Sequence, residues 1–475
     1  MPRGWDAGRF LDALADRDSI RVLDRPADYD GHDAGYRLEL LEAASGSGCD
    51  EAVTTAEIRL DGHRLVVLAS EFRFLGGSLG ITAAQRLVAA LEHATAHRLP
   101  VLALPSSGGT RMQEGTPAFL RMIDVVDAIH RHRSSGLPYL VHLRHPTTGG
   151  AFASWGSLGQ LTTATPGALI GLLGPRVTEA LNGAAFPHDI QTSENLHRHG
   201  ILDALVEEEG LRDHLAAVLS CLVPGQDGND SPASLPSDEQ TAVDGPPDPW
   251  DCVLSTRAAT RPGLQELFAA TTSPVFLRGT GAGERDDSIA MALCRIAGRS
   301  CLIVGHDRSA STAPGPAALR GARRGIRLAG ELGLPLITVV DTSGAELSAR
   351  AENGALAGEV ARCLGELRAA TVPTATVLLG QGCGAAALAL FSARHTIAAA
   401  DAWLAPLPLE GASMIVHRDT GHAPQMAAQQ GISAHQLART GQVNRLLSGT
   451  GHETLIPQVM KELQLFLHQC SALTV

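Results

Sequence analysis

The chain has 475 residues, of which 44% are hydrophobic and 19% are charged, a composition typical of a globular protein with two or three domains. Its formal net charge of −12 argues against a nucleic-acid binder, because contacts with phosphates require a basic surface. No apolar run is long enough to cross a membrane and the N-terminus lacks the apolar core of a signal peptide, so we expect a cytoplasmic protein.

Cysteine, lysine and histidine usage argues against several kinds of site. None of the eight cysteines forms a C-x-x-C pair, so neither a zinc ribbon nor a dithiol redox site is indicated. The 38 lysines and arginines include a single lysine, Lys461, which lies in a C-terminal helical pattern. His93 and His97 have the spacing of zinc ligands on a helix, but no third ligand is evident. A solvated helix face is therefore the favoured interpretation, and no metal site is predicted.

The first elements follow a polar segment. Residues 1–50 are weakly patterned, and we interpret them as an N-terminal arm. Residues 52–70 predict a β-hairpin, because two alternating runs flank an Asp61-Gly62 turn. Gly76-Gly77 then interrupts the chain before an amphipathic helix over about residues 78–97.

Two strand-to-helix turns in the first half carry paired glycines. The strand at residues 101–104 runs into Gly108-Gly109, and the strand at residues 139–143 runs into Gly149-Gly150 and a helix over residues 151–158. Backbone N–H groups at such a helix start have no intrahelical acceptor and suit an oxyanion or a carbonyl oxygen. The alternative is a tight turn that binds no ligand, and the turns alone do not decide between the two.

The second half repeats the first. Residues 224–249 are rich in Pro, Ser, Asp and Gly, and we interpret them as a linker. Four landmark pairs then keep offsets of 236, 235, 236 and 235 residues: Gly62 with Gly298, Pro100 with Pro335, Gly108 with Gly344, and Pro138 with Pro373. We infer a duplicated domain, at residues 51–223 and 250–475. The alternation of strands and helices predicts an α/β fold of ββα units wound into a spiral in each half.

The duplication predicts a second set of backbone donors. The strand after Pro373 ends in Gly380-Gln381-Gly382-Cys383-Gly384-Ala385-Ala386. A site between a first-half and a second-half surface would receive donors from both copies, so we expect a homodimer or a larger multiple in which two chains pack head to tail. Residues 279–283 hint at a dinucleotide-binding loop, but they lack the full glycine spacing.

Four linked motifs in the first half resemble the β subunit of the bacterial acetyl-CoA carboxylase carboxyltransferase. They are Phe72–Gly80, Ser107–Glu114, Pro146–Gly150 and Ala168–Val177, and their order and spacing also agree. The second half is similar to that enzyme's α subunit at Gly305-His306, Asp341–Ala345, Gly380–Gly382 and Glu410–Ser413. The resemblance implies two tandem crotonase-like ββα-spiral domains in one chain.

The resemblance also implies a reaction. Carboxybiotin releases CO₂, the biotin enolate removes the α-proton of an acyl-CoA, and the thioester enolate attacks the CO₂. Gly149 and Gly150 would hold the thioester oxygen, and the donors for the biotin ureido oxygen would fall within Gly384, Ala385 and Ala386. The family's second glycine pair corresponds to Ala385-Ala386 if this stretch is aligned to the α subunit, or to Gly384-Ala385 if it is aligned to the first half. The residues assigned to substrate binding are Gly76, Gly77, Gly108, Gly109, Arg111, Gly174, Arg323 and Ala386. Arg323, Arg324 and Arg327 share a predicted helix, and these three arginines could either meet CoA phosphates or face water.

The implied activity requires partners. Biotin needs a lysine on an exposed hairpin, and Lys461 lies in a helical run, so we expect a separate biotin carboxyl carrier protein and a biotin carboxylase. A short acyl-CoA, with acetyl-CoA first, is the expected substrate. The β subunit's amino-terminal zinc ribbon is missing, as the cysteine spacing indicates, and two further departures from the family pattern are the alanines at 385 and 386 and the loss of proline and glycines over residues 345–350. They motivate an alternative, a biotin-independent decarboxylase of a malonyl thioester. A non-catalytic scaffold subunit is a third possibility.

Overall fold

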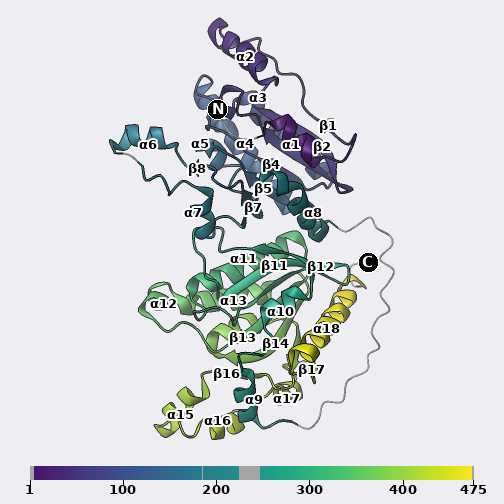
Figure 1. Ribbon diagram of the computed structural model, residues 1–475, viewed down its shortest axis with the longest axis vertical. Helices are drawn as coiled ribbons and strands as arrows, with labels where there is room; N and C mark the ends of the chain where they lie inside the picture. Colours follow the sequence, from purple (N-terminus) through teal and green to yellow (C-terminus); the bar gives the residue numbers. More distant parts are fainter. Residues whose placement is uncertain (1–4, 185, 224–245, 473–475) are drawn as a thin grey trace. The chain divides into compact units, whose positions relative to one another are not determined.

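The computed structural model describes residues 5–184, 186–223 and 246–472, in two compact units, Met1–Val223 and Pro224–Val475 (Figure 1). Residues 224–245 of the segment interpreted as a linker lie outside the described residues, and its last residue begins helix α9 (Pro249–Thr256). Within the described ranges, no helix is both long enough and apolar enough to cross a membrane.

The first unit contains the predicted hairpin. Strands β2 (Val53–Leu60) and β3 (His63–Ser70) pair antiparallel along their whole length. Asp61 and Gly62 between them have φ values of 50° and 78°, the left-handed pair that a two-residue type I′ turn requires. The hairpin prediction is therefore confirmed.

The sheet of the first unit has the order β1-β2-β3-β4-β5-β7-β9 and is parallel from β3 onward. The parallel strands after β3 are β4 (Val101–Leu104), β5 (Tyr139–Leu143), β7 (Leu161–Ala164) and β9 (Ala204–Leu205). Helices α3 (Ile81–Ala96) and α4 (Gly115–Ser134) connect β3 to β4 and β4 to β5. The two strands predicted here are present, and so is the helix predicted over about residues 78–97, although α3 starts later than expected.

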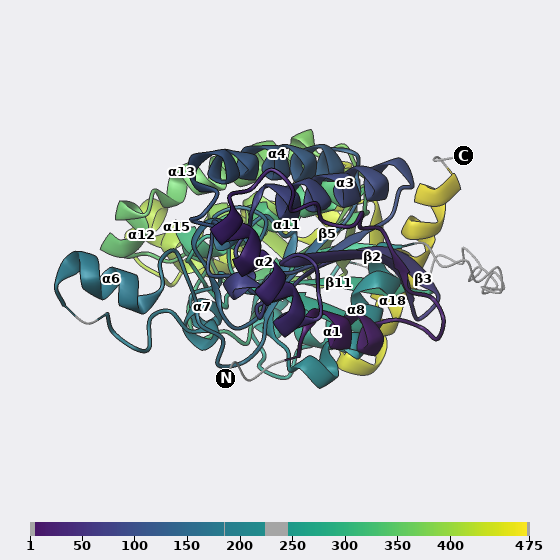
Figure 2. The same ribbon diagram turned by 90° about the horizontal axis from the view of Figure 1, so that it is seen from above.

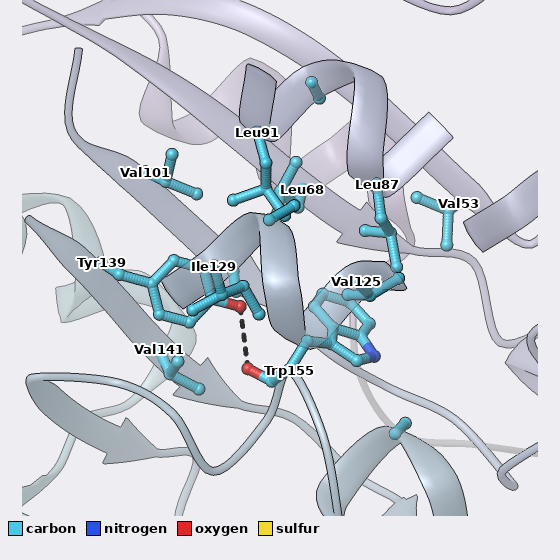
Figure 3. Close-up of a cluster of buried hydrophobic side chains, with 14 of the residues drawn as sticks. Val53, Leu68, Leu87, Leu91, Val101, Val125, Ile129, Tyr139, Val141 and Trp155 are labelled. Atoms are coloured by element: carbon cyan, nitrogen blue, oxygen red, sulfur yellow. Dashed lines mark hydrogen bonds between the residues drawn. The ribbon is translucent and has the colours of Figure 1, made fainter. Parts of the chain in front are cut away.

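Helices α3 and α4 cover one face of this sheet (Figure 2). Their buried side chains meet every second residue of the strands, as the two-residue period of a strand requires. Figure 3 shows this core, with Leu87, Leu91, Val125 and Ile129 from the helices and Val101, Tyr139 and Val141 from the strands. The buried Tyr139 hydroxyl donates to the Trp155 carbonyl at 2.8 Å, so burying the phenol leaves no polar group unpaired.

The first helix of the N-terminal segment lies on the other face of the same sheet. Helix α1 (Ala7–Leu14) packs on β2 and β3 beside α8 (Leu211–Leu222) (Figure 2). Strand β1 (Arg21–Val22) pairs with β2 at the edge of the sheet. The buried Arg144 guanidinium donates to the Ser70 carbonyl at 2.8 Å and to the Trp5 carbonyl. The segment interpreted as an arm is thus part of the first unit, together with helix α2 (Ala34–Ser47).

The second unit repeats this topology, in the order β10-β11-β12-β13-β14-β15-β17, with β16 paired to β14. Its hairpin, β11 (Ile289–Ile296) and β12 (Arg299–His306), lies 236 residues after β2 and β3, since 289 minus 53 and 306 minus 70 both equal 236. The counterparts of α3, β4, β5 and α5 (Gly149–Phe152) are α11 (Pro316–Leu332), β13 (Leu336–Thr342), β14 (Thr374–Cys383) and α14 (Gly384–Leu390). The inferred duplication is confirmed.

The other elements of the second unit are β10 (Thr272–Leu277), β15 (His395–Ala399), β16 (Trp403–Ala405), β17 (Arg445–Leu447), α10 (Leu264–Ala269), α12 (Ala349–Asn353), α13 (Leu356–Ala369), α15 (Leu409–His417), α16 (Ala423–Gln429), α17 (Ala434–Arg439) and α18 (His452–Ala472). The loop at residues 279–283 leads from β10 into strand β11 and not into a helix, which agrees with the missing glycine spacing and argues against a dinucleotide-binding loop.

The predicted helix over residues 151–158 is also wrong in extent. Helix α5 spans only Gly149–Phe152, and the Gly156 N–H then donates back to the Ala151 carbonyl at 2.9 Å. This turn places the Trp155 side chain wholly inside the core of the first unit. Small residues offer little apolar surface to stabilise a longer helix, so burial of the indole decides where the helix ends.

Candidate active site

Two glycine turns stack on each other in the first unit. The Ser107 N–H donates to the Pro146 carbonyl at 2.8 Å, and the Thr148 N–H donates to the Ser107 carbonyl at 2.8 Å. A Cβ atom on Gly149 would lie 2.9 Å from the Gly109 Cα, and Gly149 has a φ of 62°. Glycine is therefore required at position 149 both by the left-handed backbone and by the close approach of another main chain.

The other two motifs of the resemblance join the same layer. The Gly108 N–H donates to the Gly76 carbonyl at 2.9 Å, and a Cβ atom on Gly77 would overlap the Ser106 carbonyl oxygen. On the far side, β6 (Thr147–Thr148) pairs with β8 (Ile170–Gly171). Four segments that are far apart in sequence thus lie next to one another, and the structure brings Gly76, Gly77, Gly108, Gly109, Gly149 and Gly150 together.

The donors of the Gly149 turn differ from the expected pair. We expected the N–H groups of Gly149 and Gly150 both to be available, but the Gly149 N–H donates to the Leu172 carbonyl at 2.9 Å. The first backbone bond that closes α5 runs from Ala153 to Gly149. Gly150 and Ala151 are the second and third residues of α5, where the helix itself supplies no acceptor. The expectation is corrected: Gly149 shapes the turn, and Gly150 and Ala151 are its candidate donors.

Arg111 was expected to bind substrate, but it lies inside the first unit. Its side chain is 1% exposed and forms ion pairs with Glu51 and, at 3.2 Å, with Glu114. Burial opposes its charge, yet the hydrogen bonds and charge of Glu51 hold the pKa of Arg111 above its ordinary value. The guanidinium also donates to the Ser78 carbonyl at 2.8 Å. This placement argues against contact with substrate and gives Arg111 the task of bracing the glycine layer.

Two residues of this buried cluster were missed by sequence reasoning. The Tyr36 hydroxyl, from α2, donates to Glu114 at 2.6 Å, and the second Glu114 oxygen accepts the Ile81 N–H at 2.6 Å. Burial, followed by the bond to Glu114, raises the pKa of the Tyr36 phenol. Neither Tyr36 nor Glu51 belongs to a motif, so only the fold reveals that the N-terminal segment supports the turn.

The counterpart of the Gly149 turn in the second unit lies at the start of α14. Gly384 follows β14 directly and has a φ of 69°, close to the value at Gly149, which lies 235 residues earlier. The next residue, Ala385, is exposed, whereas the Ala386 side chain is buried. The structure therefore favours the alignment in which Gly384 and Ala385 correspond to Gly149 and Gly150, over the alignment that uses Ala385 and Ala386.

Arg323 was also expected to contact substrate. It lies on α11, where its guanidinium donates to Glu359 at 2.7 Å and forms an ion pair with Glu366 at 2.5 Å, both on α13. The bond to Glu366, the largest cause, raises the pKa of Arg323. Arg327 pairs with Glu366 as well, at 3.3 Å. This network of ion pairs joins two helices. Arg323 therefore matches neither expectation, the contact with CoA phosphates or the exposure to water.

Gly174 stands apart from the glycine layer. It is the N-cap of α6 (Pro175–Asn182), a helix that extends away from the sheet of its unit (Figure 1). Leu181 on this helix is 71% exposed, and Leu172 and Val177 are exposed as well. The structure therefore does not bring Gly174 to the two stacked turns, although the neighbouring Leu172 carbonyl contacts Gly149.

The His93 and His97 pair has other contacts. His93 Nε2 lies 3.0 Å from a Glu57 oxygen, and the two histidine rings have centroids 4.1 Å apart. Among the residues that the structure describes, no group of three or more His, Cys, Asp or Glu side chains has an arrangement that could hold a metal.

Comparison with known proteins places these features in one family. The carboxyl transferase domain matches residues 13–449. The chain is 51% identical over 417 residues to the probable biotin-dependent acyl-coenzyme A carboxylase beta3 subunit of Mycobacterium tuberculosis, covering 87% of this chain and 83% of that protein. It is 34% identical over 429 residues to the acetyl-coenzyme A carboxylase carboxyl transferase subunits beta/alpha of Salinispora arenicola, covering 87% of this chain and 76% of that protein.

A solved structure agrees. The transcarboxylase 12S hexamer, with methylmalonyl-coenzyme A and methylmalonic acid bound, matches with a TM-score of 0.76 at 20% identity, covering 98% of this chain and 89% of that chain. At this identity the match establishes the fold alone. The predicted α/β fold with two tandem crotonase-like domains is confirmed.

Proposed function

This chain belongs to the carboxyl transferase family, as the carboxyltransferase of a biotin-dependent acyl-CoA carboxylase, and we propose that it carboxylates the α-carbon of a short acyl-CoA, acetyl-CoA first. The observation that carries the proposal is a turn found in both units. In each, a buried parallel strand ends in a left-handed glycine that opens a helix, at Gly149 and at Gly384.

The first turn suits a thioester oxygen. A carbonyl oxygen gains negative charge when the α-proton leaves, and backbone N–H groups fixed in advance stabilise that charge more than they stabilise the neutral thioester. Gly150 and Ala151 supply such groups, and Gly149 and Gly109 fix their position. None of these four residues carries a titratable side chain, so the turn stabilises charge and does not itself take the proton.

The second turn suits the ureido oxygen of biotin, which also accepts hydrogen bonds from backbone donors. Ala385, next to the left-handed Gly384, is exposed and keeps its N–H. Carboxybiotin, bound there as a substrate, would supply the carboxyl group and the base that removes the α-proton. The chain would contribute binding, orientation and charge stabilisation.

Partners follow from this proposal. The single lysine, Lys461, lies on α18, so biotin would arrive on a separate biotin carboxyl carrier protein charged by a biotin carboxylase. A homodimer or a larger multiple would complete each site if donors from one half must face donors from the other half of a second chain.

The test is carboxylation by the purified chain with carboxylated carrier protein and either acetyl-CoA or propionyl-CoA. Product with one of them supports the proposal, and no product with either would count against it. Incubating malonyl-CoA with the protein and avidin tests the alternative function, because CO₂ release that avidin does not block would identify a biotin-independent decarboxylase. Normal activity of the assembled complex after loss of the Gly150 donor would instead indicate a scaffold subunit.

A further inference from the structure

A histidine of the second unit lies between two of its elements without ordinary partners. His306 is the last residue of β12, and its side chain is 1% exposed. It borders a cavity of about 590 Å³ at the carboxyl ends of β12, β13 and β14, next to Asp341, Thr342 and Gln381. Parallel strands direct their carboxyl ends to one edge of the sheet, so this edge is also where the Gly384 turn begins.

The contacts of the His306 ring connect it to that turn. The imidazole lies against the backbone of Val339 on β13 and of Ala386 on α14. Neither ring nitrogen, however, makes a hydrogen bond of normal geometry. Burial lowers the pKa of His306 to about 4, so the ring is neutral near pH 7, with one donor and one acceptor nitrogen. A buried ring with both nitrogens unpaired is unfavourable and calls for an explanation.

Two arginines of the same cavity, unlike His306, have charged partners. Arg308 pairs with Asp341 at 3.0 Å, and Arg261 pairs with Asp401 at 2.6 Å. These guanidinium groups are neutralised by carboxylates, so the cavity does not select an anion. The neutral imidazole of His306 is a polar group of this cavity that lies beside the first turn of α14.

The first unit shows the contrast. The position that corresponds to His306, 236 residues earlier, is Ser70, the last residue of β3. Its hydroxyl is also buried and unpaired, but it is too short to bridge to a helix as an imidazole can. The first turn is instead tied through the bond from the Gly149 N–H to the Leu172 carbonyl. The two units therefore stabilise their corresponding turns with different residues.

We propose that His306 is a positioning residue for the second turn. When a ligand fills that turn, the ring N–H donates to the Ala386 carbonyl and holds the preceding Ala385 N–H toward the ligand oxygen. Hydrogen bonds around a site are often loose without ligand and tighten when it binds, which accounts for the imperfect geometry. This inference rests on the proposed function, because it takes the biotin ureido group as the ligand of the Gly384 turn.

The test compares His306→Phe, which fills similar volume without polar atoms, with His306→Gln, which keeps a donor and an acceptor. KM and kcat are measured with carboxylated carrier protein and acyl-CoA varied in turn. His306→Phe should raise the KM for the carboxylated carrier by about tenfold and change the KM for acyl-CoA less than about twofold, and His306→Gln should recover most of the loss. Ser70→Ala, the matched variant of the first unit, should leave the KM for the carrier unchanged.

Amide hydrogen exchange gives a readout that does not depend on activity. In His306→Phe the amides of residues 384–388 should exchange faster, and those of residues 149–153 should exchange at the wild-type rate. If His306→Phe does not fold, His306→Leu is judged by the same criteria. Unchanged exchange with an unchanged carrier KM, or equal losses for both substrates, would overturn the proposal. If the wild-type chain is inactive with the carboxylated carrier, the proposed function fails and the role of His306 in positioning biotin fails with it; selective loosening of residues 384–388 would then show only that the ring supports the start of α14.

Discussion

Replacing Gly149 by alanine tests whether the two stacked turns must approach as closely as they do. An L-residue in the left-handed region costs about 1–2 kcal/mol, and Gly149 has a φ of 62°. The added methyl carbon would also lie 2.9 Å from the Gly109 Cα and 3.2 Å from the Gly108 carbonyl oxygen. Backbone atoms cannot swing aside like a side chain, so an overpacking cost of about 1–3 kcal/mol is added. We expect Gly149→Ala to destabilise the first unit by about 2–5 kcal/mol.

Two other glycines separate these contributions. Gly48 ends α2 with a φ of 78° and has open space where a methyl carbon would stand, and Gly384 has a φ of 69° with its nearest neighbour, the Pro406 carbonyl oxygen, at 3.6 Å. Alanine at either position should therefore cost only the backbone strain of about 1–2 kcal/mol. Gly48→Ala serves as the matched control for stability within the first unit and should keep normal turnover.

The assay is urea unfolding followed by hydrogen exchange of peptides from each unit, because two units need not unfold in one step. Turnover is measured on the folded fraction. The added methyl displaces the Gly150 and Ala151 donors, and because a misplacement of about 1 Å costs about 10²-fold, kcat of Gly149→Ala should fall by about 10–10²-fold. If Gly149→Ala were no less stable than Gly48→Ala and retained its kcat, the close approach would not matter and our account of the turn would be refuted.

Three further predictions concern the first unit. Gly150→Pro removes one N–H from the candidate donor pair and should lower kcat by about 10²–10³-fold in the carboxylation assay, and a folded variant with normal turnover would make the turn purely structural. Glu51→Gln removes one of the two carboxylates that pair with the buried Arg111, so the free energy of unfolding in urea should fall by about 3–5 kcal/mol. Asp124→Asn, in an exposed ion pair, is the control and should lower it by less than about 1 kcal/mol. Burial, with a smaller effect of Arg144, lowers the pKa of His142 to about 3 from 6.5, so its contribution to stability is complete above about pH 6.5 and is lost as the pH falls toward 3. Urea unfolding at pH 7 and at about pH 5 should give a lower free energy of unfolding at the lower pH, by about 1.4 kcal/mol for each pH unit below 6.5. His142→Phe should reduce this difference.

Much of the fold could be predicted because proline and glycine mark the ends of its strands. Pro100 and Pro138 stand immediately before β4 and β5, and both strands were predicted at their observed bounds. The hairpin was predictable because the Asp61-Gly62 turn requires two left-handed residues. The end of α5 was not predictable, because it depends on where Trp155 finds space in the core, and no local pattern encodes that.

Some features of the candidate site could likewise be predicted from local sequence, and others could not. The glycines at the turns were found because a strand that ends in paired glycines at a helix start is a local signal. The contacts that give each residue its task are between distant segments: Leu172 takes the Gly149 N–H, and Glu51 takes the Arg111 guanidinium. The family resemblance assigned Arg111 to substrate binding, and the arginines on one helix suggested that Arg323 meets CoA phosphates. Only the fold shows that carboxylates of the protein already occupy both.

The alanine at position 385 was one reason to consider a biotin-independent decarboxylase, but the geometry of the second turn does not support that reason. In each unit the first residue of the turn needs glycine for its left-handed backbone, and Gly149 and Gly384 both supply it. The second residue has no such need. At Gly150 a methyl would lie 2.9 Å from the Thr110 hydroxyl, a neighbour particular to the first unit, whereas Ala385 carries its methyl on the exposed side of α14 and keeps its N–H. The change from glycine to alanine therefore removes neither a donor nor a required backbone conformation, and it gives no physical reason to exclude carboxybiotin.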